Sequence, residues 1–310
     1  MRHARRHARR LLLAAVLGLA PSLASAQTPG TLEPPPLPPL ANPDDPALPA
    51  KELFGRAAAP APLAARALGS YARGCLAGAV ALPIDGPNWR VMRVSRNRNW
   101  GHPELIALLE RLAARTPEAV GWPGLLVGDL SQPRGGPMLW GHASHQVGLD
   151  ADIWLTPMPE DGVTRAERET MMATSVVRAD RRDVDYAVWT PAHARLIELA
   201  AREPRVERLF VNAAIKKALC RDTTGDRSWL GKVRPMWGHD YHVHIRMACP
   251  AGETGCEKQA PVPAGDGCDA TLDWWFTDEV LNPKPGGGGG RREKTLADLP
   301  GECRRVLVAR

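Results

Sequence analysis

Apolar residues recur along the chain with two different periods, and each period predicts a different secondary structure. Residues 105–112 carry apolar side chains at helical spacing, and residues 192–201 repeat that pattern directly after Pro191. We expect both stretches to form helices on a core. Five short segments are β-prone or alternating and are bounded by Gly, Pro or Asp, which predicts strands. These predicted strands are 89–94, 124–127, 149–155, 206–211 and 242–247.

The order of these segments favours one fold class. Strands and helices interleave without regular βαβ spacing and without a phosphate-cradling glycine motif. We therefore expect an α+β fold, with a central and mostly antiparallel sheet flanked by helices and loops. The chain contains no internal repeat, so one domain is expected, spanning residues 51–280.

The N-terminal stretch predicts export. Residues 1–26 combine an arginine-rich start, an apolar run and the sequence Ala-Ser-Ala at 24–26, which is typical of a cleaved signal peptide. The apolar run of about ten residues is roughly half of a membrane-spanning helix, so a periplasmic protein without stable membrane insertion is expected. Residues 27–50 are proline-rich and predict a disordered leader. Residues 281–310 predict a flexible glycine-rich tail that ends in a stapled segment.

Composition changes the picture in one respect. With 44% hydrophobic and 24% charged residues, the 310-residue chain is not mostly disordered, collagen-like or a multi-span membrane protein. Its net charge of +6 would suit a nucleic-acid partner. However, five arginines precede residue 11, so cleavage after residue 26 leaves 35 of the 40 basic residues against 34 acidic ones. A nucleic-acid partner is therefore not expected.

Six cysteines follow the predicted cleavage site. An even number in an oxidising compartment predicts three disulfides, in preference to a thiolate metal site or free thiols. Sequence proximity suggests only one pair, Cys249 with Cys256, and leaves the others open. The cysteines are Cys75, Cys220, Cys249, Cys256, Cys268 and Cys303.

Candidate chemistry concentrates in two histidine-rich segments, 140–154 with two histidines and 238–244 with three. If residues 242–244 of the second segment form a strand, His242 and His244 project from the same face, so that one can bind a metal while the other meets the substrate. Five clustered histidines favour a metal site over ordinary hydrogen-bonded side chains. The isolated His102 and His193 are expected to be structural.

The first segment, 140–154, adds a carboxylate. Asp152 lies on a predicted strand, and His145 lies in the preceding loop, so the two can converge on one ion. Zinc accepts imidazole nitrogen and carboxylate oxygen, and a catalytic zinc site keeps one position for water. Trp140 and Trp237 adjoin the two segments and are candidates for the wall of a substrate groove.

These residues also resemble a known family. The order His-x6-Asp followed by His-x-His is similar to the metal signature of the group that contains lysostaphin, the D-alanyl-D-alanine peptidases and the hedgehog zinc domain. More narrowly, several stretches over residues 51–303 resemble the penicillin-insensitive murein endopeptidase family. These stretches are 96–103, 141–145, 152–155, 210–216 and 233–235.

The resemblance implies a zinc ion held by His145, Asp152 and His244, with His142 as a further ligand. It implies hydrolysis of the D-alanyl to meso-diaminopimelyl crosslink of peptidoglycan by metal-activated water. Two alternatives remain open. One is a D,D- or L,D-carboxypeptidase or amidase of the same metal group, and the other is a non-catalytic wall-binding zinc module.

The resemblance also assigns further residues. His242 is implied as general base or acid, with a pKa near neutrality, and His239 as a group that orients or stabilises the reacting atoms. A second metal position of the family falls on Asp180 and Asp183, but the second residue there is a histidine in the family, so a solvated charge run is the better prediction. The implied disulfides are Cys75 with Cys303, Cys220 with Cys268, and Cys249 with Cys256.

Overall fold

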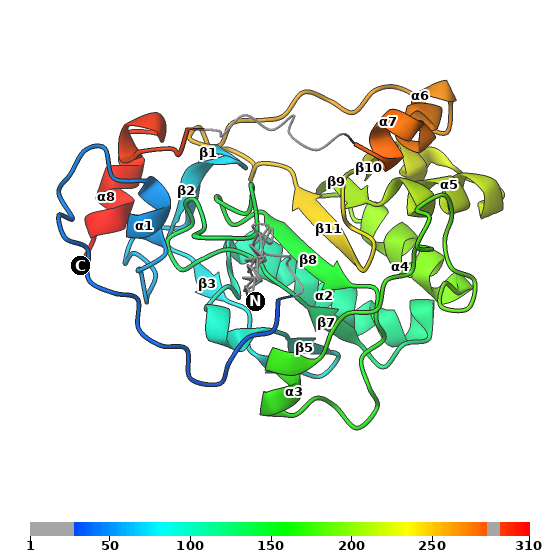
Figure 1. The fold of residues 1–310 in the computed structure, drawn as a ribbon, viewed down its shortest axis with the longest axis horizontal. Coiled ribbons are helices and arrows are strands. Elements are labelled where there is room, and N and C mark those ends of the chain that lie inside the picture. Colours follow the sequence, from blue (N-terminus) through cyan, green and yellow to red (C-terminus); the bar gives the residue numbers. More distant parts are fainter. Residues whose placement is uncertain (1–27, 284–291) are drawn as a thin grey trace, which may run out of the picture.

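The centre of the protein is a seven-stranded sheet (Figure 1). The computed structural model describes residues 28–283 and 292–310. The strands in sheet order are β10 (Val233–Pro235), β9 (Val206–Val211), β11 (His242–Met247), β8 (Asp150–Trp154), β7 (Leu125–Val127), β5 (Trp89–Val91) and β4 (Asp85–Gly86). Two small two-stranded sheets pair β1 (Arg66–Ser70) with β2 (Arg73–Ala77) and β3 (Val80–Ala81) with β6 (Trp100–Gly101).

The central sheet is mixed. Its pairs β10–β9 and β7–β5 are parallel, whereas the pairs that join β9, β11, β8 and β7, and the pair β5–β4, are antiparallel. The expected α+β fold with a mostly antiparallel sheet is therefore confirmed, although the sheet is not purely antiparallel.

Four of the five predicted strands form within one residue of their expected bounds. The exception is the segment 89–94, whose strand ends at Val91. Arg93 takes a left-handed backbone conformation with φ 56°, and the 3-10 helix Val94–Arg96 follows it, which turns the chain away from the sheet.

Helices pack against the sheet through apolar faces. The two predicted helices are α2 (Pro103–Val120) and α4 (Pro191–Ala201), and their buried leucines join one core with the inward residues of β8, β9 and β11. His102 caps α2 by accepting a hydrogen bond from the Glu104 amide. The other α-helices are α1 (Ala50–Phe54), α3 (Arg165–Thr170), α5 (Ala213–Asp222), α6 (Ala270–Asp273), α7 (Asp278–Leu281) and α8 (Glu302–Val308). The remaining 3-10 helices are Ser228–Lys232, Trp274–Phe276 and Leu296–Asp298.

Three disulfides cross-link the chain over separations of 7 to 228 residues. They join Cys75 to Cys303, Cys220 to Cys268, and Cys249 to Cys256, the same pairs that the resemblance implies. The first of them fixes α8 to β2, and Figure 1 shows α8 (red) beside α1 and β2.

The ends of the chain are described only in part. The predicted signal peptide 1–26 and the glycine run 286–290 lie outside the described residues. Residues 28–49 form no helix or strand, but the Gly30 amide donates a hydrogen bond to the Glu169 carbonyl. No described helix has both the length and the apolarity that a membrane crossing requires.

Candidate metal centre

The candidate centre lies across the two middle strands of the sheet. In the antiparallel register of β8 and β11, His244 stands opposite Asp152 and His242 stands opposite Trp154. Side chains that are directly opposite in such a pair lie on the same face. The two histidines of β11 therefore share a face with Asp152, as the alternation of the sequence predicts.

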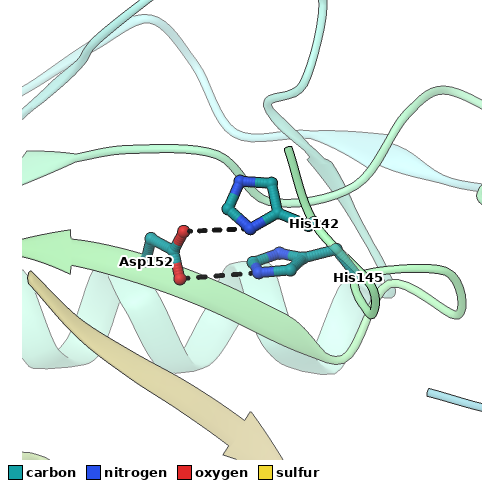
Figure 2. A group of neighbouring side chains, drawn as sticks. All are labelled: His142, His145 and Asp152. Carbon is teal, nitrogen blue, oxygen red and sulfur yellow. Dashed lines mark ion pairs between the residues drawn. The ribbon is translucent and has the colours of Figure 1, made fainter. Parts of the chain in front are cut away.

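The loop before β8 supplies the other imidazoles. His145 has a left-handed backbone with φ 65°, its amide donates to Asp150 Oδ2 over 2.9 Å, and its carbonyl accepts from Ser131 Oγ over 2.6 Å. These bonds fix the loop so that His145 Nε2 lies 3.4 Å from Asp152 Oδ1. His142 Nδ1 lies 3.6 Å from Asp152 Oδ2, and Figure 2 shows both imidazoles turned toward this carboxylate.

These distances fit ligands that surround one cation. One nitrogen or oxygen of each of His142, His145 and Asp152 lies within 4.8 Å of the others, and His244 Nδ1 lies 3.2 Å from Asp152 Oδ1. Bond lengths of about 2.0–2.2 Å in a tetrahedral zinc site place neighbouring ligand atoms about 3.4 Å apart.

Buried polar atoms without hydrogen-bond partners also indicate a cation at this position. Asp152 Oδ1 and His145 Nε2 are buried and have no hydrogen-bond partner within the described part of the chain. A buried polar atom without a partner costs about 1–3 kcal/mol, so such atoms are normally explained by an ion or ordered water. The donor set of imidazoles and one carboxylate suits zinc or a similar transition-metal ion.

Two further aspartates stand behind the histidines. Asp150 Oδ1 lies 3.2 Å from His244 Nε2 and accepts a hydrogen bond of 2.7 Å from Arg246 Nε. Asp129 Oδ2 lies 3.0 Å from His142 Nε2 and accepts from Arg98. A carboxylate on the outer nitrogen of a histidine fixes the ring and its tautomer.

The charges of this centre favour a cation. Burial raises the pKa of Asp152, but the surrounding imidazoles, led by His242, outweigh burial and hold that pKa well below its usual range. Burial lowers the pKa of His244, but Asp150 and Asp152 outweigh burial and raise it to about 9. Two ionised carboxylates therefore attract positive charge to this point of the sheet.

His242 and His239 lie beside the candidate ligands. His242 Nε2 is 3.6 Å from Asp152 Oδ1, and the rings of His242 and His239 are 4.7 Å apart. Burial lowers the pKa of His242 to about 3 and that of His239 to about 4. Burial thus shifts the pKa of His242 below the near-neutral value expected from the sequence, because it penalises the charged ring. Both rings are neutral at physiological pH.

The other candidate residues are two exposed tryptophans and two aspartates in ion pairs. Trp140 is 44% exposed and carries the guanidinium of Arg98 over its ring at 4.9 Å, while Trp237 is 48% exposed. Asp183 pairs with Arg221 at 2.8 Å.

Asp180 is engaged in a similar way, because it pairs with Arg178 at 2.7 Å. Within the described residues, neither aspartate lies in a group of three or more side chains that could hold a metal ion. Both carboxylates are instead paired with arginines.

The aspartates behind the centre have little signal in the sequence. The alternation of β8 predicts that Asp150 shares a face with Asp152, but not that it contacts His244. Asp129 follows β7 as a single acid with no spacing pattern. Both act through partners on other segments, so only the fold brings these contacts together.

Comparisons with known proteins agree with this geometry. Residues 67–308 match the family described as "Penicillin-insensitive murein endopeptidase". A protein of that name from Haemophilus influenzae is 48% identical over 240 residues, which cover 77% of this chain and 82% of the relative. Proteins of the same name from Klebsiella pneumoniae and Escherichia coli are each 42% identical, over 243 and 248 residues. These alignments cover 78% and 80% of this chain, and 86% and 88% of the relatives.

The match spans the central sheet, the loop of His145 and the cysteines of the three disulfides. The identity is high over most of both chains. The chain therefore belongs to the penicillin-insensitive murein endopeptidase family.

Proposed function

We propose that the protein is a zinc-dependent endopeptidase that hydrolyses the D-alanyl to meso-diaminopimelyl crosslink of peptidoglycan. The observation that carries this proposal is that four imidazoles approach one buried carboxylate, that of Asp152, within 3.6 Å. The relatives are named as murein endopeptidases, which supports peptidoglycan as the substrate.

In this proposal His145, Asp152 and His244 hold the zinc ion, and His142 is a further ligand. A bound zinc ion would polarise the scissile carbonyl and bring the pKa of water down toward about 7. Asp129 bonds the outer nitrogen of His142 over 3.0 Å, and Asp150 Oδ1 lies 3.2 Å from the outer nitrogen of His244, so that the inner nitrogens of both rings face Asp152.

The two remaining histidines act on protons in the proposed mechanism. His242 is neutral at physiological pH and can accept the proton of the attacking water at Nε2 and return it to the leaving amine. His239 Nδ1 faces the Trp237 carbonyl at 2.7 Å, which orients its ring toward the reacting group. No nucleophilic side chain is required.

The site of action follows from the same proposal. Three disulfides suit an oxidising compartment, and peptidoglycan lies outside the inner membrane, so we place the mature protein in the periplasm. The division into signal peptide 1–26, leader 27–50, domain 51–280 and tail 281–310 is part of this proposal.

The test is digestion of purified murein by the mature protein, with and without a chelator, and identification of the released fragments. We expect crosslinked muropeptides to be converted to monomers, the chelator to abolish this, and added zinc to restore it. The variant H244A should lose both zinc and activity, whereas H242A should keep zinc and lose activity.

Three results would reject parts of this proposal. Release of only terminal D-alanine would favour the carboxypeptidase alternative. Binding to sacculi without any cleavage would favour the wall-binding module, in which the neutral pair His239 and His242 would have no task. Full activity of zinc-depleted protein would reject the metal mechanism.

A further inference from the structure

A groove of about 500 Å³ opens beside His239. Its lining includes Gly238 and Asp240, the two neighbours of His239 in sequence, and Asn212, whose side-chain amide donates a hydrogen bond of 3.0 Å to the Gly238 carbonyl. We call this cavity the His239 groove. The ring of His239 lies 4.7 Å from that of His242 and 5.8 Å from that of His244, so the groove borders the candidate centre through His239.

Two tryptophans form one wall of the His239 groove. The rings of Trp237 and Trp275 meet edge to face with centroids 5.6 Å apart, and Trp275 belongs to the distant 3-10 helix Trp274–Phe276. Val280 and Leu281 of α7 continue this wall. Such an apolar surface can pack against the methyl and methylene groups of a peptide, while the polar groups of that peptide contact other parts of the groove.

Cations line another part of the groove. The charged residues that line the groove are two arginines, Arg178 and Arg181, and one acid, Asp240, so the lining carries a net positive charge. Arg178 is engaged by Asp180 at 2.7 Å. The guanidinium of Arg181 has no ion pair or hydrogen bond with any described residue.

The two residues that follow Arg181 both have partners. Arg182 donates to the Phe276 carbonyl over 3.5 Å, and Asp183 pairs with Arg221 and Lys217 of α5. Arg181 is therefore the basic side chain of this loop that lines the groove and remains available to a ligand.

The backbone holds Arg181 in a costly conformation. Its φ is 57°, in the left-handed region, which costs about 1 kcal/mol for a residue with a side chain. Its amide donates to the Arg178 carbonyl over 2.9 Å, and a bridge between Val177 and Val184 closes the loop. Strained positions of this kind cluster at ligand-binding sites, so the loop presents Arg181 in a fixed position.

We infer that the His239 groove binds one stem peptide of the crosslinked substrate and that Arg181 binds a carboxylate of that stem. The inference rests on the proposed function. Stem peptides are anionic, and the diaminopimelyl residue carries a carboxylate beside the amine of the scissile bond. Arginine binds a carboxylate through two parallel hydrogen bonds, and the tryptophan wall packs against the aliphatic part of the chain.

The test compares R181Q with R182Q on a purified crosslinked muropeptide dimer. Gln keeps a polar side chain and the backbone cost of position 181 but removes its charge, and R182Q makes the same exchange outside the groove. We expect R181Q to raise KM roughly tenfold with kcat within about twofold of wild type, because the two-pronged contact of Arg181 with the carboxylate is lost at an exposed site. R182Q should leave both constants within about twofold.

A second substrate identifies the group that Arg181 binds. A dimer whose diaminopimelyl carboxylates are amidated should raise the KM of wild type by the same factor. R181Q should then show no further loss, because the interaction is already absent. A KM for R181Q equal to that of wild type, or equal losses in R181Q and R182Q, would overturn the inference.

A binding measurement separates this inference from the proposed function. The change in tryptophan fluorescence, to which Trp237 and Trp275 contribute among the ten tryptophans, gives the Kd of an uncrosslinked stem tetrapeptide without any turnover. If wild type binds the tetrapeptide about tenfold more tightly than R181Q but cleaves no crosslink, the groove stands and the proposed function fails. If wild type cleaves crosslinks and the two Kd values agree, the groove assignment fails alone.

Discussion

Asp152 and His244 face each other across the central strands β8 and β11, and their side chains approach to 3.2 Å between Oδ1 and Nδ1. The two strands are hydrogen-bonded to each other and flanked by β7 and β9. The candidate metal centre therefore rests on the most enclosed part of the sheet, where ladder hydrogen bonds fix the backbone positions of both residues.

Asp152 should be the ligand whose loss matters most. Its carboxylate is shared by all four imidazoles, so we expect D152A to retain less than about one tenth of the zinc of wild type after dialysis. H142A should weaken zinc binding less than D152A does, because the carboxylate ligand remains together with His145 and His244. Metal analysis of the dialysed proteins measures both effects.

H102A is the matched control for these variants. His102 caps α2 and lies 3.0 Å from Glu253, away from the centre, so its loss should cost about 1 kcal/mol of folding free energy and leave zinc content unchanged. Zinc loss in H102A equal to that in D152A would mean that the assay reports unfolding.

Asp150 should control zinc affinity without being a ligand. D150N removes the negative charge that lies 3.2 Å from His244 Nε2, so we expect zinc affinity to fall about 10- to 100-fold in a chelator competition. The variant also leaves Arg246 buried without its charged partner, which should cost about 3–5 kcal/mol in urea unfolding.

A double variant separates the two effects of Asp150. D150N/R246Q removes the unpaired charge and should recover much of the lost stability, while zinc affinity stays low. Recovery of zinc affinity together with stability would contradict the positioning role.

His193 should make the fold sensitive to mild acid. Its Nδ1 accepts from the Thr190 amide and its Nε2 lies 3.0 Å from the Leu155 carbonyl, so the neutral ring fits the folded state. Burial lowers its pKa below 6.5, and the unfolded chain therefore binds the proton more readily. Folding stability must fall as pH drops through the unfolded value, by at most about 2 kcal/mol between pH 7.5 and 5.

Urea unfolding of wild type and H193Q at both pH values tests this sign. Gln can still donate to the Leu155 carbonyl but does not titrate, so H193Q should lose less stability on acidification than wild type. An equal pH dependence in the two proteins would show that other groups account for it.

The three disulfides should contribute unequally. The bond between Cys75 and Cys303 closes a separation of 228 residues, against 7 for Cys249 and Cys256. Chain entropy gives about 5 kcal/mol for the long loop and about 2.5 kcal/mol for the short one. C75A/C303A should therefore unfold at clearly lower denaturant than C249A/C256A, and the opposite order would reject the entropic account.

Local pattern was sufficient where an element is both amphipathic and well bounded. The strands at 206–211 and 242–247 form with their predicted bounds. By contrast α2 extends to Val120, past Thr116 and Pro117, because packing of its apolar face outweighs the hydrogen bond that proline cannot make. The hairpin β1–β2 has small, weakly β-prone residues and carries no clear strand signal.

The candidate site divides in the same way. The clustered histidines and Asp152 are visible in sequence, because ligands of one ion recur at short spacings. Arg98, Arg246 and the aspartates that they bind are single residues in separate segments. Their roles depend on burial and register, which no local pattern contains.

The link between Cys75 and Cys303 also sets an order of events. β2 carries Cys75, and the Gly74 amide in the same strand donates to the side chain of Gln146, the neighbour of His145. In a chain that crosses a membrane with its N-terminus first, Cys303 emerges 228 residues after Cys75, so this clasp can close only after every candidate metal ligand has crossed. Maturation of the wall-cutting machinery would then wait for α8 to emerge.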